Sequence, residues 1–328
     1  MNSVFQAIEK TWYRSSPWSV LLRPLSLIYG ALVQLKAATY RFGALRCSEV
    51  GAPVIVVGNL TVGGSGKTPL VIRLVQLLDR AGYSPGVVSR GYRGRTTEFP
   101  CLVQDGSNPS LVGDEPLLVH QQTGCPVVTD RDRVRGARHL TRECGVDIVI
   151  SDDGLQHLRM PRAIEIAVID GERRFGNGRL LPAGPLRESP SRLNTVDFVV
   201  TNGGPPLSGE YGMRATINEA VHLTTGEKRS LSQFAGKKVY AIAGTANPAK
   251  FFSDLRLAGL TLCARSFPDH HPYQSSDLND LHLSTVLMTS KDAVKCRPIA
   301  GPDWWAVPQT TEVDDSFKQA LLELLQHG

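Results

Sequence analysis

The residues best suited to chemistry lie in the stretch Gly58–Pro69, which reads GNLTVGGSGKTP. A phosphate-binding P-loop has the pattern G-x-x-x-x-G-K-[ST], and residues 61–68 read T-V-G-G-S-G-K-T, with threonine in place of the first glycine. In such a loop, backbone N–H groups point at phosphate oxygens, the lysine reaches the β- and γ-phosphates, and the last hydroxyl binds Mg²⁺. The sequence therefore predicts a nucleotide and magnesium site at Thr61, Val62, Gly63, Gly64, Ser65, Gly66, Lys67 and Thr68.

Phosphoryl transfer on a P-loop also needs an acidic partner for the metal, usually at the end of an apolar strand. Asp152 and Asp153 end the run VDIVISDD and fit that requirement, although an Asp-Asp-Gly sequence is also common in ordinary turns. Further acidic candidates are Asp114 and Glu115 in VGDEP and Glu188 in LLPAGPLRE. All three stand in Gly/Pro-rich sequence that predicts loops, where a rigid scaffold often places binding residues.

Histidine and arginine supply the remaining candidates. The stretch FPDHHPY, residues 267–273, holds two histidines beside Asp269, which could move a proton or orient a carboxylate. They lack metal-ligand spacing. No lysine occurs between Lys67 and Lys228, whereas arginine is frequent there. Arginine pairs with phosphate or carboxylate oxygens in a bidentate manner, so this interval either faces anions or forms surface salt bridges.

The elements that must position these residues alternate between short apolar runs and amphipathic segments. The apolar runs occupy residues 53–58, 86–91, 125–130, 146–153, 164–170 and 196–203. Such alternation predicts βαβ units and an α/β fold like that of P-loop NTPases, with a mainly parallel sheet. GGPPLSGEYG, residues 203–212, reads as a linker, and the sequence beyond it predicts a second, smaller α/β domain that ends in the helix DSFKQALLELLQ.

Composition sets the outer limits. A chain of 328 residues with 41% hydrophobic and 20% charged residues can bury a large core, which excludes a disordered or fibrous protein. Its six cysteines form no C-x-x-C pair, so neither a zinc site nor a disulfide framework is predicted. The formal net charge is +5, and residues 1–50 hold six Lys/Arg against two Glu. A basic N-terminal end suggests that the chain binds an anionic membrane surface. Nucleic acid is a less favoured partner, because no aromatic-basic binding motif follows this segment.

The N-terminal segment combines this charge with apolar residues. They recur at helical spacing at Leu21, Leu25, Ile28, Leu32 and Leu35. Its longest uncharged run, residues 24–35, is well below the ~20 residues needed to cross a bilayer. The pattern predicts a helix lying in a membrane interface, with a core-packing helix as the alternative. The expected division is therefore a membrane-interface region at 1–45, a P-loop domain at 46–202, and a linker with the smaller α/β domain at 203–328.

Taken in order, the motifs of this chain resemble those of the tetraacyldisaccharide 4′-kinase family, the lipid A 4′-kinases of Gram-negative bacteria. They are GNLTVGGSGKTP, SRGYRG, VGDEP, DRDR, SDDGLQH, LLPAGPLRE, FPDHHPY and SKDAVKC. The resemblance implies transfer of the γ-phosphate of ATP to the 4′-hydroxyl of a tetraacyl glucosamine disaccharide 1-phosphate, which makes the 4′-phosphate of lipid A. It also implies ATP and Mg²⁺ as cofactors, and a monotopic or peripheral place on the cytoplasmic face of the bacterial inner membrane.

The same resemblance implies roles for individual residues. The catalytic group comprises Asp114, its partner His270, and Lys67 of the P-loop. The metal group comprises Thr68, Asp152, Asp153 and Glu188, and the candidates for substrate or phosphate contacts are Arg90, Arg187, Gln156 and His157. One departure is Ser290, which stands where the family commonly has glutamate in T-E-K-D-A-V-K.

Two other classes of protein are possible on the motifs alone. A P-loop GTPase acting as a switch or as a metal-insertion chaperone would usually recognise guanine with an N/T-K-x-D motif, and no Lys-x-Asp occurs in this chain. A peripheral membrane-binding module could use nucleotide structurally, and turnover of ATP with a lipid disaccharide would separate it from a kinase.

Overall fold

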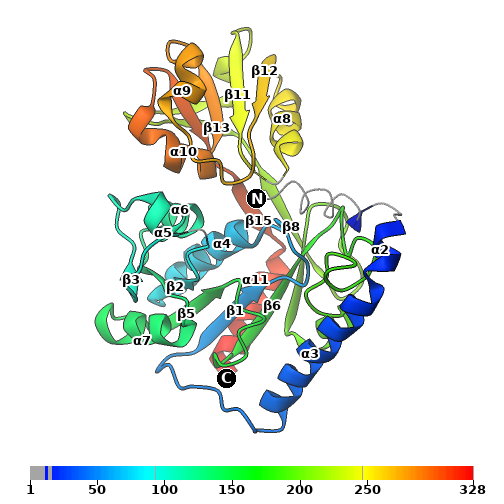
Figure 1. The fold of residues 1–328 in the computed structure, drawn as a ribbon. Helices are drawn as coiled ribbons and strands as arrows, with labels where there is room; N and C mark the ends of the chain where they lie inside the picture. Colours follow the sequence, from blue (N-terminus) through cyan, green and yellow to red (C-terminus); the bar gives the residue numbers. More distant parts are fainter. Residues whose placement is uncertain (1–11, 14–16, 93, 246, 328) are drawn as a thin grey trace.

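The computed structural model describes residues 12–13, 17–92, 94–245 and 247–327, which form two α/β lobes (Figure 1). The large lobe is built on a sheet with the strand order β15-β8-β7-β6-β1-β5-β2-β4-β3. Its strands are β1 Val54–Gly58, β2 Pro85–Ser89, β3 Cys101–Leu102, β4 Val127–Thr129, β5 Ile148–Asp152, β6 Ile164–Asp170, β7 Phe198–Asn202, β8 Tyr211–Thr216 and β15 Thr310–Val313.

The interior of this sheet is parallel, with antiparallel pairing where β3 joins β4 and where β15 joins β8. The apolar runs predicted from the sequence all become strands, because a parallel sheet covered on both faces buries every side chain of its central strands. One face packs against α4, α6 and α11, and the opposite face packs against α7. The helices of this lobe are α2 Pro17–Leu21, α3 Arg23–Arg41, α4 Lys67–Arg80, α5 Pro109–Val112, α6 Asp114–Thr123, α7 Arg133–Glu143 and α11 Asp315–His327, with a 3₁₀ helix at Pro190–Thr195.

The second lobe has a smaller sheet with the strand order β10-β9-β14-β13-β11-β12. Its elements are β9 Glu219–His222, β10 Lys228–Ser230, β11 Val239–Ala243, α8 Pro248–Leu257, β12 Leu262–Ser266, α9 Ser275–Leu278, β13 Val286–Thr289, α10 Ser290–Cys296 and β14 Trp304–Val307, with 3₁₀ helices at Leu231–Phe234, Asn279–Leu281 and Arg297–Ile299. One apolar cluster joins this sheet to α8, and another joins it to α9 and α10. The predicted mainly parallel, two-part α/β fold is therefore present.

The structure differs from the expected domain division after residue 203. Part of that chain belongs to the large lobe and not to the second one. Strands β8 and β15 extend the large sheet, and α11 packs into the core of the large lobe through Phe317 and Leu321 (Figure 1). The chain thus enters the second lobe after β8 and leaves it before β15. The predicted terminal helix exists, but its apolar face completes the first lobe, because Phe317 makes an edge-to-face contact with Phe198 of β7.

The N-terminal helix α3 packs on the large lobe through small residues. Ser26 and Gly30 are its buried positions. The Oγ atom of Ser26 donates a hydrogen bond to the carbonyl of Leu180 at 2.9 Å, and a Cβ atom on Gly30 would lie 2.7 Å from Leu180 Cδ1. The part of the 1–45 region at residues 1–11 and 14–16 lies outside the described residues.

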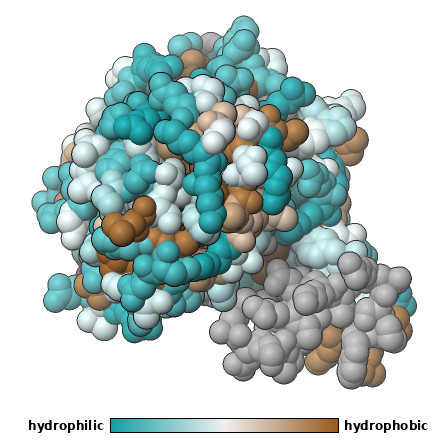
Figure 2. Space-filling model, turned by 90° about the horizontal axis from the view of Figure 1, so that it is seen from above, coloured by the Kyte–Doolittle hydropathy of each residue, from teal (hydrophilic) through white to brown (hydrophobic). Residues whose placement is uncertain are grey.

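The apolar residues predicted for a membrane-facing helix are exposed rather than buried. Leu21, Leu25, Ile28, Leu32 and Leu35 are each at least half exposed, so the core-packing alternative is wrong for this face. By contrast, the surface seen from the second lobe is mainly hydrophilic, with separate hydrophobic patches (Figure 2). Within the described residues, no helix has both the length and the apolar character needed to cross a membrane.

Candidate active site

The P-loop connects β1 to α4, as the motif predicted. Gly66 has a φ of 93° and caps the start of α4. A Cβ atom here would lie 2.2 Å from Asn202 Nδ2, so the position requires glycine for both conformation and space. The loop is also tied from outside: Asn202 Nδ2 donates to the carbonyl of Ser65 at 3.1 Å, and the backbone N–H of Val62 donates to the carbonyl of Pro185 at 2.8 Å.

Asp152 and Asp153 lie at the end of β5, next to the P-loop strand β1 in the sheet. The Nζ atom of Lys67 lies 3.6 Å from Asp153 Oδ1, and Arg187 Nη1 donates to both oxygens of Asp153 at 2.9 and 3.0 Å. Asp153 has a left-handed φ of 51°, which aspartate tolerates better than most residues. Asp153 is thus paired with two cations. Asp152 Oδ1, by contrast, is buried and has no hydrogen-bond partner among the described residues.

Their different surroundings separate the pKa values of the two carboxyls. Burial raises the pKa of Asp152 to about 6, and the negative charges of Glu115 and Asp153 add to that effect. Burial would also raise the pKa of Asp153, but the charges of Lys67 and Arg187 outweigh it and lower the pKa to about 2. A buried carboxylate oxygen without a partner, at the end of the strand that pairs with β1, suits a cation such as Mg²⁺.

In the described part of the chain, no group of three or more His, Cys, Asp or Glu side chains is arranged to hold a metal ion. The fit to magnesium rests on the buried, unpaired Oδ1 atom of Asp152, because a Mg²⁺ ion that arrives with a nucleotide is held by one or two carboxylates together with phosphate oxygens and water.

Asp114 and His270 meet between the two lobes. Asp114 is the first residue of α6 rather than the loop residue that the sequence predicted, because Gly113 starts the helix with a φ of 95°. His270 follows β12 in the second lobe and has a φ of 59°. Its Nδ1 atom lies 3.0 Å from Asp114 Oδ1 and 2.8 Å from Oδ2. Both side chains are less than a tenth exposed.

The pKa of Asp114 is lower than its ordinary value. Burial alone would raise it, but the hydrogen bond from His270 and the positive charge of Lys291 outweigh burial. Asp114 is therefore an ionised carboxylate at physiological pH, and can accept a proton from a group that reaches it.

Three of the remaining predicted residues form a cluster, whereas Arg90 and His157 lie outside it. Gln156 donates to Glu188 Oε1 at 2.7 Å and accepts from Arg187 Nη1 at 3.2 Å, so these three residues form one cluster beside Asp153. Arg90 is exposed at the end of β2 and is close enough to Arg133 to affect its pKa. Burial and the charge of Arg133 lower the pKa of His157 to about 4. His157 is therefore neutral at physiological pH and brings no positive charge to a phosphate.

Sequence reasoning gave no individual role to several residues that shape the site. The buried Arg133 donates from Nη2 to the carbonyls of Asp152 and Asp153 at 2.9 and 3.3 Å, which braces the turn after β5. Lys291 and Lys295 of α10 reach the carboxylates at the start of α6. The DRDR and SKDAVKC motifs marked these three positions, but sequence alone could not show where their side chains lead.

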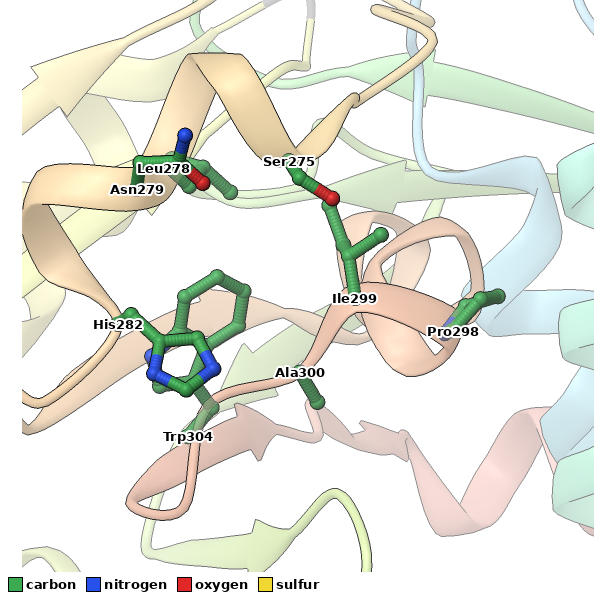
Figure 3. A pocket seen from close by; sticks show the side chains of 8 residues that line it. All are labelled: Ser275, Leu278, Asn279, His282, Pro298, Ile299, Ala300 and Trp304. Atoms are coloured by element: carbon green, nitrogen blue, oxygen red, sulfur yellow. The ribbon is translucent and has the colours of Figure 1, made fainter.

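The second lobe also has a pocket of about 350 Å³. It is lined by Ser275, Leu278, Asn279, His282, Pro298, Ile299, Ala300 and Trp304 (Figure 3). None of the predicted site residues belongs to this set, so the pocket is separate from the P-loop and from the pair of Asp114 and His270.

A P-loop with a facing carboxylate pair, in a two-lobed α/β fold with a buried Asp–His pair, defines a P-loop phosphotransferase. Comparison with known proteins identifies the family within this class. Residues 18–326 match the model of the family described as tetraacyldisaccharide-1-P 4′-kinase. This chain therefore belongs to the tetraacyldisaccharide 4′-kinase family, and its activity is the ATP-dependent 4′-phosphorylation that gives lipid A its 4′-phosphate.

Individual relatives agree. The chain is 45% identical over 322 residues to a tetraacyldisaccharide 4′-kinase of Methylobacillus flagellatus, covering 97% of this chain and 95% of the relative. It is 45% identical over 328 residues to one of Nitrosococcus oceani, covering 100% and 97%. Among solved structures, LpxK from Aquifex aeolicus in complex with ATP is similar, with a TM-score of 0.80, 26% identity, and coverage of 94% of this chain and 99% of that chain.

Proposed function

We propose that the Asp114–His270 pair and the P-loop act on the two reactants of one phosphoryl transfer. The 4′-hydroxyl oxygen of the tetraacyl disaccharide 1-phosphate forms a bond to the γ-phosphorus of ATP, the bond from that phosphorus to the β,γ-bridging oxygen breaks, and ADP leaves. The hydroxyl proton passes to Asp114. The observation that supports this most is the buried contact between Asp114 and His270, which supplies an ionised proton acceptor in the same fold as a P-loop.

On the donor side, the backbone of residues 61–66 and the Lys67 ammonium bind the phosphates of ATP. Arg187, which now pairs with Asp153, can turn one of its donors toward the transferring phosphoryl group. Arg90, exposed at the end of β2, is a contact for the phosphate of the acceptor. Gln156 and His157 hold the turn after β5, since Gln156 links Glu188 to the P-loop region through the carbonyl of Asn59 at 3.2 Å.

Thr68 and Asp152 would hold Mg²⁺ directly, with Asp153 and Glu188 next to them. The ion would neutralise charge that develops on the β- and γ-phosphates. Asp152 suits the direct role better than Asp153, because Asp152 Oδ1 is unpaired and buried whereas Asp153 already pairs with Lys67 and Arg187.

On the acceptor side, Asp114 takes the proton and His270 keeps the carboxylate in position. A sugar hydroxyl is a poor nucleophile, and a positioned base typically speeds its reaction by ~10²–10⁴-fold. His270 comes from the second lobe and Asp114 from the first, so the pair is complete only when the lobes are in contact, which limits hydrolysis of ATP in the absence of acceptor.

We infer that helix α3 binds a membrane surface beside this site. Its exposed leucines and isoleucine face outward, while Tyr29 Oη donates to the carbonyl of Arg187 at 3.1 Å and Lys36 Nζ donates to the carbonyl of Gln156 at 3.3 Å. The helix that enters the lipid headgroup region is thus bonded to the loops that carry Arg187 and Gln156. The membrane is the cytoplasmic face of the bacterial inner membrane, where ATP and the lipid substrate are both available.

The test is to incubate the purified protein with γ-labelled ATP, Mg²⁺ and tetraacyl disaccharide 1-phosphate, and to follow label in the lipid fraction. We expect one labelled phosphate per disaccharide, at the 4′ position. An acceptor that lacks the 4′-hydroxyl is the matched control and should stay unlabelled. Release of labelled inorganic phosphate without any labelled lipid would contradict the proposal.

A further inference from the structure

The contact between the lobes contains a lysine that the reaction so far does not use. Lys291, the second residue of α10, has a side chain only 17% exposed. Its Nζ atom donates to Glu115 Oε1 at 2.9 Å and to Asp269 Oδ1 at 3.4 Å. It also lies 3.1 Å from the Nε2 atom of His270, the ring nitrogen remote from Asp114.

We propose that Lys291 is a positioning residue that fixes the tautomer of His270, so that the ring proton resides on Nδ1 and is donated to Asp114. This inference rests on the proposed role of the Asp114–His270 pair. It concerns which nitrogen of the ring carries the proton, and therefore whether the pair is joined by a hydrogen bond.

For a neutral His270 ring, the donor and acceptor chemistry favours one arrangement. A lysine ammonium has three N–H donors and no acceptor, whereas a neutral imidazole has one N–H and one bare nitrogen. For a neutral ring, Nε2 is the bare nitrogen that accepts from Nζ of Lys291 at 3.1 Å, because the carboxylate that also faces Nε2, Asp269 Oδ2 at 3.6 Å, lies beyond hydrogen-bond distance. The proton is then on Nδ1, which faces both oxygens of the Asp114 carboxylate at 3.0 and 2.8 Å.

The opposite tautomer would be unfavourable at both ends of the ring. An N–H on Nε2 would face the Lys291 ammonium at 3.1 Å, with Asp269 Oδ2 too distant at 3.6 Å to accept a good hydrogen bond, and the lone pair of Nδ1 would face the negative charge of Asp114. The His270 side chain is only 9% exposed, so little water is available to satisfy either mismatch, and unpaired polar groups in such surroundings are costly.

The surroundings keep Lys291 charged, as this role requires. Burial on its own would lower the pKa of Lys291, but the negative charges of Glu115, Asp114 and Asp269 outweigh burial and raise the pKa above its ordinary value. Glu115 belongs to the first lobe and Lys291 to the second. The tautomer of His270 is therefore held by the same contact between α10 and α6 that brings His270 to Asp114.

The readout is the protonation of the two ring nitrogens, measured by ¹⁵N NMR on the full chain with labelled histidine. Loss of signals in His270→Gln identifies those of His270. We expect a protonated Nδ1 and a bare Nε2 in the parent protein. In Lys291→Met, whose side chain has similar length and no donor, the proton should be shared between Nδ1 and Nε2, and kcat should fall by roughly 10–100-fold with little change in KM for ATP.

Two variants separate the tautomer from other effects. Lys291→Arg keeps N–H donors and should restore the Nδ1 proton. Glu115→Gln removes the ion pair with Lys291 without removing the donor to His270, so the ring pattern should remain that of the parent. Should Lys291→Met fail to fold, as judged by circular dichroism, Lys291→Leu provides the same measurement.

An unchanged ring pattern in Lys291→Met, or a changed one in Lys291→Arg, would overturn the inference. The proposed catalytic role has a separate test. If His270→Gln keeps the kcat of the parent, the role of the Asp114–His270 pair fails, whereas the ring-nitrogen pattern still decides the role of Lys291.

Discussion

The Nδ1 atom of His270 lies 2.8 Å from Oδ2 of Asp114, across the boundary between two lobes and 156 positions apart in the sequence. Asp114 begins helix α6 of the large lobe, and His270 follows the edge strand β12 of the second lobe. This short contact between two buried side chains joins the two lobes at the proposed active site. Four predictions follow from this arrangement and from its surroundings.

The pair should act as a unit. Asp114→Ala and His270→Ala should each lower kcat by about 10²–10⁴-fold, and the double variant should be little worse than the more damaging single variant. ATP affinity should change little, because neither residue belongs to the P-loop. Steady-state kinetics and nucleotide titration provide the measurements. His271→Ala is the matched control, since His271 pairs with Asp277 within its own lobe, and it should stay close to the parent. Additive losses in the double variant would contradict a shared role.

Lys67→Ala should abolish nearly all turnover while leaving the fold intact. The Lys67 charge is needed at the developing phosphoryl oxygens, and loss of one such contact typically costs at least ~10²–10³-fold in kcat. Transfer of labelled phosphate to lipid measures the effect, and circular dichroism checks the fold. A folded variant with near-normal kcat would show that the loop does not hold the transferring phosphate.

Neutralising Asp152, the last residue of β5, and Asp153, which follows it, should change the thermal stability of the protein in opposite directions. The raised pKa of Asp152, about 6, means that its contribution to stability is complete below its ordinary pKa and is lost as pH rises through 6. The lowered pKa of Asp153, about 2, means that its contribution is present above its ordinary pKa and is lost as pH falls through 2. At pH 8 and without metal, Asp152→Asn should therefore raise the melting temperature, and Asp153→Asn should lower it.

The expected gain for Asp152→Asn is roughly 1–3 kcal/mol, from the free energy that accompanies a pKa shift of this size. The expected loss for Asp153→Asn is smaller, because its side chain is 35% exposed and water screens its ion pairs. Thermal unfolding at pH 8 in the presence of a chelator measures both changes, and the same comparison at pH 4.5 should show a smaller gain for Asp152→Asn. Despite its higher stability, Asp152→Asn should lose kinase activity, because an amide is a poor ligand for Mg²⁺. Destabilisation by Asp152→Asn at pH 8 would be the contrary result.

Replacing Leu25, Ile28 and Leu32 together with serine should release the protein from vesicles. Each of these residues is more than half exposed, and each contributes about 1.5–3 kcal/mol if it is inserted in lipid. Flotation with vesicles that contain anionic lipid measures binding. Leu257 and Leu283 of the second lobe, 84% and 87% exposed, provide a matched control, since their replacement with serine should leave vesicle binding unchanged. Equal flotation of the α3 variant and the parent would contradict a role for α3.

The sequence by itself determined the local elements and the type of chemistry. The P-loop pattern, the apolar runs that became β1, β2 and β4–β7, and the order of the motifs all depend on near neighbours in the chain, and such patterns can be read without a structure. The exposed apolar face of α3 also followed from its spacing, because helical periodicity determines which side chains share a face.

Tertiary structure decided what depends on residues far apart in the chain. It returned β15 and α11 to the large lobe, since their apolar side chains complete its core. It separated the pKa values of Asp152 and Asp153, because the ion pairs with Lys67 and Arg187 outweigh burial at Asp153, whereas burial dominates at Asp152. It also brought Lys291, His270 and Asp114 into one row of contacts, in which Lys291 lies next to His270 and His270 lies next to Asp114. No local pattern encodes that row, because its distances depend on how the two lobes pack against each other.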